Sequence, residues 1–254
     1  MGRLIAGGDS FIYGSELADC YVNNVEVVSH LTYPALIANE LKMDYCCVAQ
    51  PGYSNNAIRR TVMDACEQSH NVELVIVMWS FPNRYEFRFD NAWEQISAWS
   101  TVTSIEEIKK SFVIDNPIVL KHHANKLKRD QTLGITDFAK SFYDHVGSNK
   151  HWETYNFLSD VLILQQYLKL KNIPYLFTSV DESILQAQNY VDGSLATLRS
   201  LIDFNSWGWF DHKGFYTWAK DMGFPFATTH PKEQAHIEAA HLIYEHLRYI
   251  SRLP

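Results

Sequence analysis

The chain has 254 residues, of which 46% are hydrophobic and 20% are charged, and its net charge is −7 with a pI of about 5.9. This composition is typical of a soluble globular protein with enough apolar residues for a sizeable core. The acidic balance argues against a nucleic-acid-binding protein, which usually carries a basic surface. No apolar stretch reaches the roughly 18 residues of a membrane span, so we expect no membrane partner.

The four cysteines show no zinc or disulfide spacing and are expected to be reduced core residues: Cys20, Cys46, Cys47 and Cys66. The N-terminus has no basic segment followed by a long apolar one, so we expect no signal peptide and a cytoplasmic protein. No cluster of His, Cys, Asp or Glu has a recognisable metal-ligand spacing. We therefore predict neither a metal nor an organic cofactor.

Apolar runs that read as buried strands alternate along the chain with segments of helical periodicity. The predicted elements are a strand at 3–8, a helix at 30–42, a strand at 44–49, a helix from about 55, a strand at 72–79, a helix at 151–171, a strand at 173–179 and a helix from about 232 to 251. This alternation predicts a three-layer α/β/α sandwich with four or five parallel strands.

Two segments interrupt this alternation. Residues 84–150 are mixed in character, and residues 181–226 are irregular and rich in aromatic side chains. We predict one α/β domain over residues 1–254, with residues 84–150 as an insertion after the third strand.

Polar residues directly follow the first predicted strand, in the stretch "AGGDSFIYG". Ligands of parallel sheets gather at the carboxyl ends of the strands. The glycine spacing fits neither a dinucleotide fingerprint nor a phosphate-binding loop. Ser10 at this place is either part of a polar turn or a nucleophile, and a nucleophilic serine needs a base and donors for an oxyanion.

The segment "GDSFIYG" resembles the first block of the SGNH, or GDSL-type, esterase family, in which the serine after the first strand is the nucleophile. The family's second block is a glycine after the second strand, here Gly52 in "AQPGYSNNAI". The last block ends in a histidine before the final helix, here His230 in "ATTHPKEQAH". The resemblance implies a flavodoxin-like SGNH fold, Ser10 as nucleophile and His230 as general base. It also implies an oxyanion hole from the backbone N–H groups of Ser10 and Gly52, and Asp9 as support for the nucleophile turn.

The third block of the family, Gly-x-Asn-Asp after the third strand, is altered in this chain. The strand ends in "MWSFPNRYE", with Trp79 in the place of the glycine and Phe81 in the place of the asparagine. The third oxyanion donor is therefore Asn83, two residues later, or Ser80, unless no side chain supplies one.

The last block also departs from the family pattern, because Ala227 stands where the family has the aspartate that orients the histidine. The site then works as a Ser-His dyad, or another group orients the imidazole. The groups considered are a backbone carbonyl and the carboxylates of Asp211, Asp221 and Glu233.

Three further side chains are candidates for substrate binding. Arg84 follows the third strand and either binds a charged or sugar group, pairs with Glu86, or braces the insertion. Trp207 and Trp209 either line an acyl or sugar pocket or pack a long loop.

We predict from these residues a serine esterase that cleaves a carboxylic ester, with a small-molecule or glycan ester, such as an acylated carbohydrate, as substrate. The alternatives are a non-catalytic SGNH-fold binding or structural protein, and an acyltransferase that uses the same Ser-His pair. The segments "TYPALIA" and "MWS" resemble SGNH proteins of tailed-phage genomes, a resemblance that would allow a place in a virion or a role in lysis. The sequence leaves the oligomeric state open.

Overall fold

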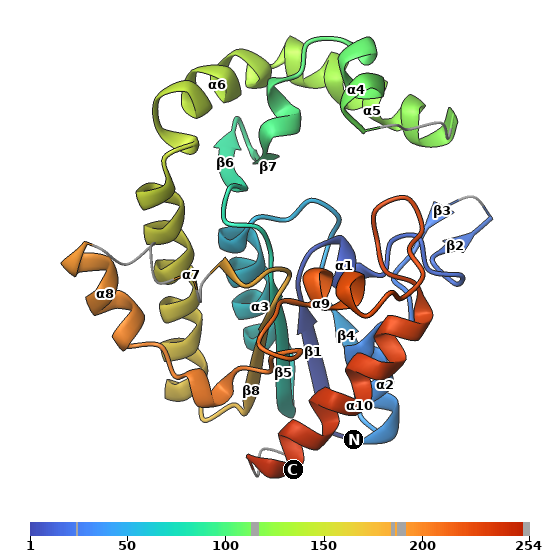
Figure 1. Ribbon diagram of the computed structural model, residues 1–254, viewed down its shortest axis with the longest axis vertical. Coiled ribbons are helices and arrows are strands. Elements are labelled where there is room, and N and C mark those ends of the chain that lie inside the picture. The colour runs from blue at the N-terminus through green and yellow to red at the C-terminus, as the bar shows by residue number, and fades with distance from the viewer. Residues whose placement is uncertain (24, 113–116, 184–185, 187–191, 251–254) are drawn as a thin grey trace.

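A four-stranded parallel sheet forms the centre of the computed structural model, which describes residues 1–23, 25–112, 117–183, 186 and 192–250 (Figure 1). The strands are β1 (Arg3–Gly7), β4 (Asp44–Cys47), β5 (Val72–Trp79) and β8 (Tyr175–Ser179). Their spatial order is β4-β1-β5-β8, and every neighbouring pair is parallel. In chain order this is second, first, third, fourth, the beginning of the flavodoxin-like order. The predicted α/β class and its four core strands are confirmed.

Helices cover both faces of this sheet, which explains why the strand residues are apolar without alternation. On β5, Leu74 and Met78 join one hydrophobic cluster, whereas Val75 and Val77 join the other. The first face is covered by α2 (Tyr33–Glu40), α9 (Phe215–Asp221) and α10 (Glu233–Tyr249), and the second by α3 (Asn55–Gln68), α7 (Lys150–Leu170) and α8 (Gly193–Ser200).

The segment between β5 and α7 forms a hairpin followed by short helices, beyond the end of the sheet where β5 finishes (Figure 1). Its elements are β6 (Tyr85–Phe89), β7 (Ala92–Ile96), the 3₁₀-helix η1 (Ala98–Thr101), α4 (Ile105–Phe112), α5 (Pro117–Thr132), α6 (Ile135–Phe142) and the π-helical turn η2 (Tyr143–Gly147). Tyr85, Ile96 and Ile135 are among the residues of a separate small hydrophobic cluster within this segment.

The stretch 181–226 is not irregular throughout, because it contains α8, the 3₁₀-helix η5 (Phe204–Ser206) and α9. The remaining short elements are α1 (Ser10–Tyr13) and a hairpin of β2 (Tyr21–Val22) and β3 (Val25–Glu26). All four cysteines are free, with Cys20 and Cys66 buried. Among the helices described, none combines the length and the apolar character needed to cross a bilayer.

His236 joins α10 to the start of α2. The backbone N–H of Tyr33, the first residue of α2, donates to His236 Nδ1 at 3.3 Å. Complete burial, with a smaller contribution from His230, lowers the pKa of His236 to about 3, against 6.5 for a free histidine. The imidazole is therefore neutral in the folded protein down to acid pH.

The unfolded chain binds more protons than the folded chain between pH 6.5 and 3, so His236 makes the folded state less stable as pH falls through this window. We expect His236→Gln to remove up to about 1.4 kcal/mol per pH unit from the pH dependence of the free energy of unfolding. Urea denaturation at pH 7 and pH 4.5 measures it, with the exposed His241→Gln on the same helix as control. Equal slopes in wild type and His236→Gln would contradict this assignment.

Candidate active site

The turn after β1 carries the predicted nucleophile. β1 leads into α1 (Ser10–Tyr13), and the Asp9 side chain caps this helix by accepting a hydrogen bond from the Phe11 N–H at 3.1 Å. The helix ends after one turn at Gly14, whose φ of 83° favours glycine. A Cβ on Gly14 would also lie 2.3 Å from Cβ of Ser29. The glycine four positions after the serine therefore lets the chain turn away and leaves Ser10 at the end of the sheet.

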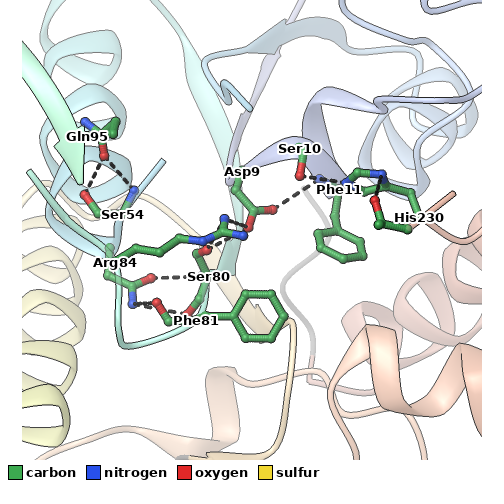
Figure 2. Close-up of polar contacts among 11 residues, drawn as sticks. Asp9, Ser10, Phe11, Ser54, Ser80, Phe81, Arg84, Gln95 and His230 are labelled. Atoms are coloured by element: carbon green, nitrogen blue, oxygen red, sulfur yellow. Dashed lines mark hydrogen bonds and ion pairs between the residues drawn. The ribbon is translucent and has the colours of Figure 1, made fainter. Parts of the chain in front are cut away.

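Ser10 and His230 are brought together although 220 positions separate them. Ser10 Oγ lies 2.8 Å from Nε2 of His230, which precedes α10 (Figure 2). The ring of Phe11 packs edge-on against the imidazole at a centroid distance of 4.8 Å. The hydroxyl and the imidazole are thus in position for proton transfer.

Glu16 lies on the other side of the imidazole. Its Oε2 is 2.8 Å from Nδ1 of His230 and also accepts the backbone N–H groups of Thr229 and His230, at 3.0 and 3.2 Å. Its Oε1 accepts the N–H of Thr228 at 3.2 Å. These donors fix the carboxylate beside Nδ1, which assigns the Nδ1–H tautomer to His230 and leaves Nε2 free to accept the Ser10 proton.

The charge of Glu16 is strongly stabilised. Burial alone would raise the pKa of its carboxyl, but the hydrogen bonds from His230, Thr229 and Thr228 outweigh burial and lower this pKa to about 2. Glu16 is therefore ionised over the whole range in which an esterase works. Its backbone has φ 69°, a left-handed conformation that is uncommon outside glycine and recurs at functional sites.

The carboxylates considered from the sequence lie elsewhere. Asp221 pairs with Lys213, and Glu233 accepts the backbone N–H of Ala18. Asp211 is exposed. Within the described part of the chain none of these three carboxylates contacts His230, so they are wrong as candidates for the group that orients its imidazole. Because Glu16 contacts His230 Nδ1, the site is more than a Ser-His dyad. Glu16 had no signal in the sequence, because its position depends on how the loop after α1 folds against residues 227–230.

Ser80 does not supply an oxyanion donor. Its Oγ donates to Asp9 Oδ2 at 2.7 Å and accepts from Arg84 Nη1 at 3.0 Å (Figure 2). Its backbone N–H donates to Asn55 Oδ1 at 2.8 Å. Both donors of Ser80 are engaged, so the expectation for this residue is wrong.

Asn83 is exposed, and its carbonyl accepts the Tyr143 hydroxyl at 2.7 Å. The Asn83 side chain makes no hydrogen bond within the described residues, and its role as third donor stays a prediction. Gly52 lies exposed in the loop after β4 with φ 82°, again a left-handed conformation. The backbone N–H groups of Gly52 and Ser10 have no partner in the part of the chain that the structure describes. Their role as oxyanion donors also stays a prediction.

Arg84 is partly buried and pairs with Asp9. Its Nη1 lies 2.8 Å from Asp9 Oδ2, and the Asp9 side chain is fully buried. Glu86 pairs with Arg60 instead, at 2.7 Å. The interpretation that Arg84 pairs with Glu86 is therefore wrong. Arg84 is also not a free cation, because it forms an ion pair with Asp9, the residue that caps the nucleophile turn.

The two tryptophans before the histidine pack in the hydrophobic core. Trp207 is 1% exposed and contacts Phe177 of β8, in the cluster beneath α3 and α7. Trp209 is half-buried and stacks on Trp207 at a centroid distance of 5.3 Å. Because Trp207 is almost completely buried, it cannot line a substrate pocket. For this residue the alternative prediction, that it packs a long loop, is confirmed. Within the described residues Trp209 has no contact with Ser10 or His230.

The order of the site residues follows the family blocks. The serine follows β1, the glycine follows β4 and the histidine precedes α10, on a sheet of order β4-β1-β5-β8. The chain has a three-layer α/β/α fold, and this order of site residues resembles that of the SGNH family. It departs from the family pattern at the third block and at Ala227, where Glu16 from the first loop takes the place of the aspartate beside the imidazole.

No protein-family model and no curated protein matches this chain. Among solved structures, an acetyl xylan esterase from the rumen bacterium Butyrivibrio proteoclasticus is similar at 13% identity and a TM-score of 0.45, over 98% of this chain and 64% of that chain. A psychrotrophic esterase from Pseudoalteromonas sp. is similar at 8% identity and a TM-score of 0.48, over 98% of both chains. Phospholipase A1 from Streptomyces albidoflavus is similar at 11% identity and a TM-score of 0.42, over 96% of this chain and 98% of that chain. Because these TM-scores lie below 0.5, we base the function on the geometry of the site.

Proposed function

We propose that the protein is a serine ester hydrolase in which Ser10, His230 and Glu16 form a catalytic triad. The observation that carries this proposal is the unbroken sequence of two 2.8 Å contacts, from Glu16 Oε2 to His230 Nδ1 and from His230 Nε2 to Ser10 Oγ. An ionised carboxylate, an oriented imidazole and a serine hydroxyl in this order make up the set that activates a nucleophilic serine.

In the first half-reaction Ser10 Oγ attacks the ester carbonyl and forms the new C–O bond. His230 Nε2 takes the hydroxyl proton, while Glu16 stabilises the imidazolium through Nδ1–H. As the tetrahedral intermediate collapses, the proton passes from Nε2 to the leaving alkoxide, and the acyl group stays on Ser10.

In the second half-reaction a water molecule gives its proton to His230 Nε2 and attacks the acyl carbon, and Oγ leaves with the proton from the imidazole. The N–H groups of Ser10 and Gly52 are assigned as oxyanion donors, with the exposed Asn83 amide as the third. One such donor contributes about 10²- to 10³-fold to the rate, so two backbone donors are compatible with a slower enzyme.

The experiment is labelling of the purified protein with a fluorophosphonate, together with hydrolysis of p-nitrophenyl acetate. We expect labelling of the wild type at Ser10, no labelling of Ser10→Ala and strongly reduced labelling of His230→Ala. Ser15→Ala is the matched control, because this buried serine lies just after α1 and its hydroxyl is engaged with Glu26. A wild type that does not react, or labelling that persists in Ser10→Ala, would exclude the proposed function.

A further inference from the structure

A groove of about 340 Å³ with both apolar and polar lining residues lies between α3, α7 and the β6 strand. Its lining includes Arg59 of α3 and Trp152, Asn156 and Asp160 of α7, but neither Ser10 nor His230. A neighbouring hollow of about 270 Å³ shares Arg59 with it. The groove is therefore a feature separate from the catalytic triad.

The groove contains an ion pair whose hydrogen-bonding capacity is largely unused. Arg59 Nε donates to Asp160 Oδ1 at 2.8 Å. Among the described residues, Arg59 Nη1 and Nη2 and Asp160 Oδ2 have no partner. The Asp160 residue is only 8% exposed. Glu86, by contrast, is satisfied by hydrogen bonds from Arg60 and Gln95. Asp160 Oδ2 and the Nη groups of Arg59 are therefore available to hydrogen-bond a ligand in the groove.

The pKa of the Asp160 carboxyl is consistent with a carboxylate that has few hydrogen-bond donors around it. Burial raises the pKa of its carboxyl to about 6, the Arg59 charge and hydrogen bond counter only part of this rise, and Glu86 adds to it. A donor from a ligand would stabilise the ionised form that Arg59 alone supports incompletely.

An aromatic surface lies beside this ion pair. Trp152 is 40% exposed, lines the groove and stacks on Tyr155 at a centroid distance of 6.0 Å. Tyr155 is exposed as well, so α7 presents a stacked aromatic pair to solvent. A large, exposed ring next to unpaired donors and acceptors suits a ligand with one apolar face and polar edges.

The charges that line the groove balance. Arg59 and Arg84 are opposed by Glu86 and Asp160, and each arginine is already paired with a carboxylate. An anion would meet both carboxylates, and a cation would meet both guanidinium groups. The lining therefore favours a neutral ligand that both donates and accepts hydrogen bonds.

We propose that this groove binds a neutral saccharide, with neighbouring hydroxyls on the Arg59–Asp160 pair and the C–H face of the sugar ring on Trp152. One hydroxyl donates to Asp160 Oδ2, and the adjacent hydroxyl oxygen accepts from the Nη groups of Arg59. The site is independent of ester cleavage, since none of these residues belongs to the triad.

The test is isothermal titration calorimetry of the full-length Ser10→Ala protein with xylohexaose, cellohexaose and maltohexaose, each used separately. We expect saturable binding of at least one of them, and the same affinity in the wild type. Trp152→Ala and Asp160→Asn should each weaken binding at least tenfold. Tyr249→Ala, which removes an exposed aromatic ring at the end of α10, should leave it unchanged. Thermal melting of each variant verifies that it is folded. Because Trp152 is exposed, Trp152→Ala should disturb folding less than Asp160→Asn.

The proposal is overturned if none of the three oligosaccharides binds, or if the affinity is the same in Trp152→Ala as in Tyr249→Ala. It is also overturned if an acidic oligogalacturonate binds more tightly than every neutral oligosaccharide. Because binding is measured without an active serine, failure here leaves the proposed hydrolase untouched, and failure of the labelling experiment leaves the groove untouched.

Discussion

Glu16→Gln is expected to lower kcat/KM for an ester substrate by about 10⁴-fold, the size of effect seen when a triad acid becomes an amide. The amide has no charge to stabilise the imidazolium, and its NH₂ group favours the wrong tautomer of His230. The Glu16 carboxyl has its pKa lowered to about 2, so this loss should appear at every pH above about 3 and not only on an acid limb. Steady-state kinetics on p-nitrophenyl acetate from pH 5 to 9 measure it.

The matched control is Glu233→Gln, a nearby carboxylate that accepts the Ala18 N–H and does not contact His230. It should retain activity within a few-fold of the wild type. Because Glu16 also holds the backbone of residues 228–230, the melting temperature of each variant is needed to separate catalysis from folding. A folded Glu16→Gln protein with wild-type kcat/KM would show that Glu16 is not the triad acid.

Arg84→Met is expected to destabilise the protein by about 3–5 kcal/mol, the range for breaking a buried ion pair by removing one partner. Asp9 is fully buried and, among the described residues, would keep as partners the Phe11 N–H and the Ser80 hydroxyl. Since Asp9 caps α1, fluorophosphonate labelling of Ser10 should slow together with the loss of stability. Urea denaturation measures the free energy of unfolding.

Asp9→Asn in the Arg84→Met background provides a rescue. The asparagine can still accept from Phe11 and donate to Ser80, so the double variant should recover part of the lost stability because no unpaired buried charge remains. Arg88→Met, which removes a surface arginine of β6, is the control and should change stability by no more than about 0.5 kcal/mol. If the double variant is as unstable as Arg84→Met alone, the Asp9 charge is not what Arg84 stabilises.

The sequence by itself indicated the four strands of the sheet and the two residues of the proposed Ser10–His230 pair. The central strand β5 is buried on both faces over most of its length, so "VELVIVMW" is almost continuously apolar and is recognisable without a partner. Ser10 stood out because polar residues directly follow the first strand, where ligands of parallel sheets gather. His230 was identified through the resemblance of "ATTHPKEQAH" to the last block of the SGNH family.

Only the tertiary structure decided which groups surround that pair. The sequence placed Ser80 and Arg84 after the third strand but did not show that both contact Asp9, and it gave no role to Glu16. These contacts form where loops from distant positions meet. The same holds for α6, whose Ile135 and Ala139 pack in one small cluster with Tyr85 and Ile96 of the β6–β7 hairpin. Local periodicity reports which face of an element is buried, whereas the partner of a charged side chain depends on contacts between residues far apart in the chain.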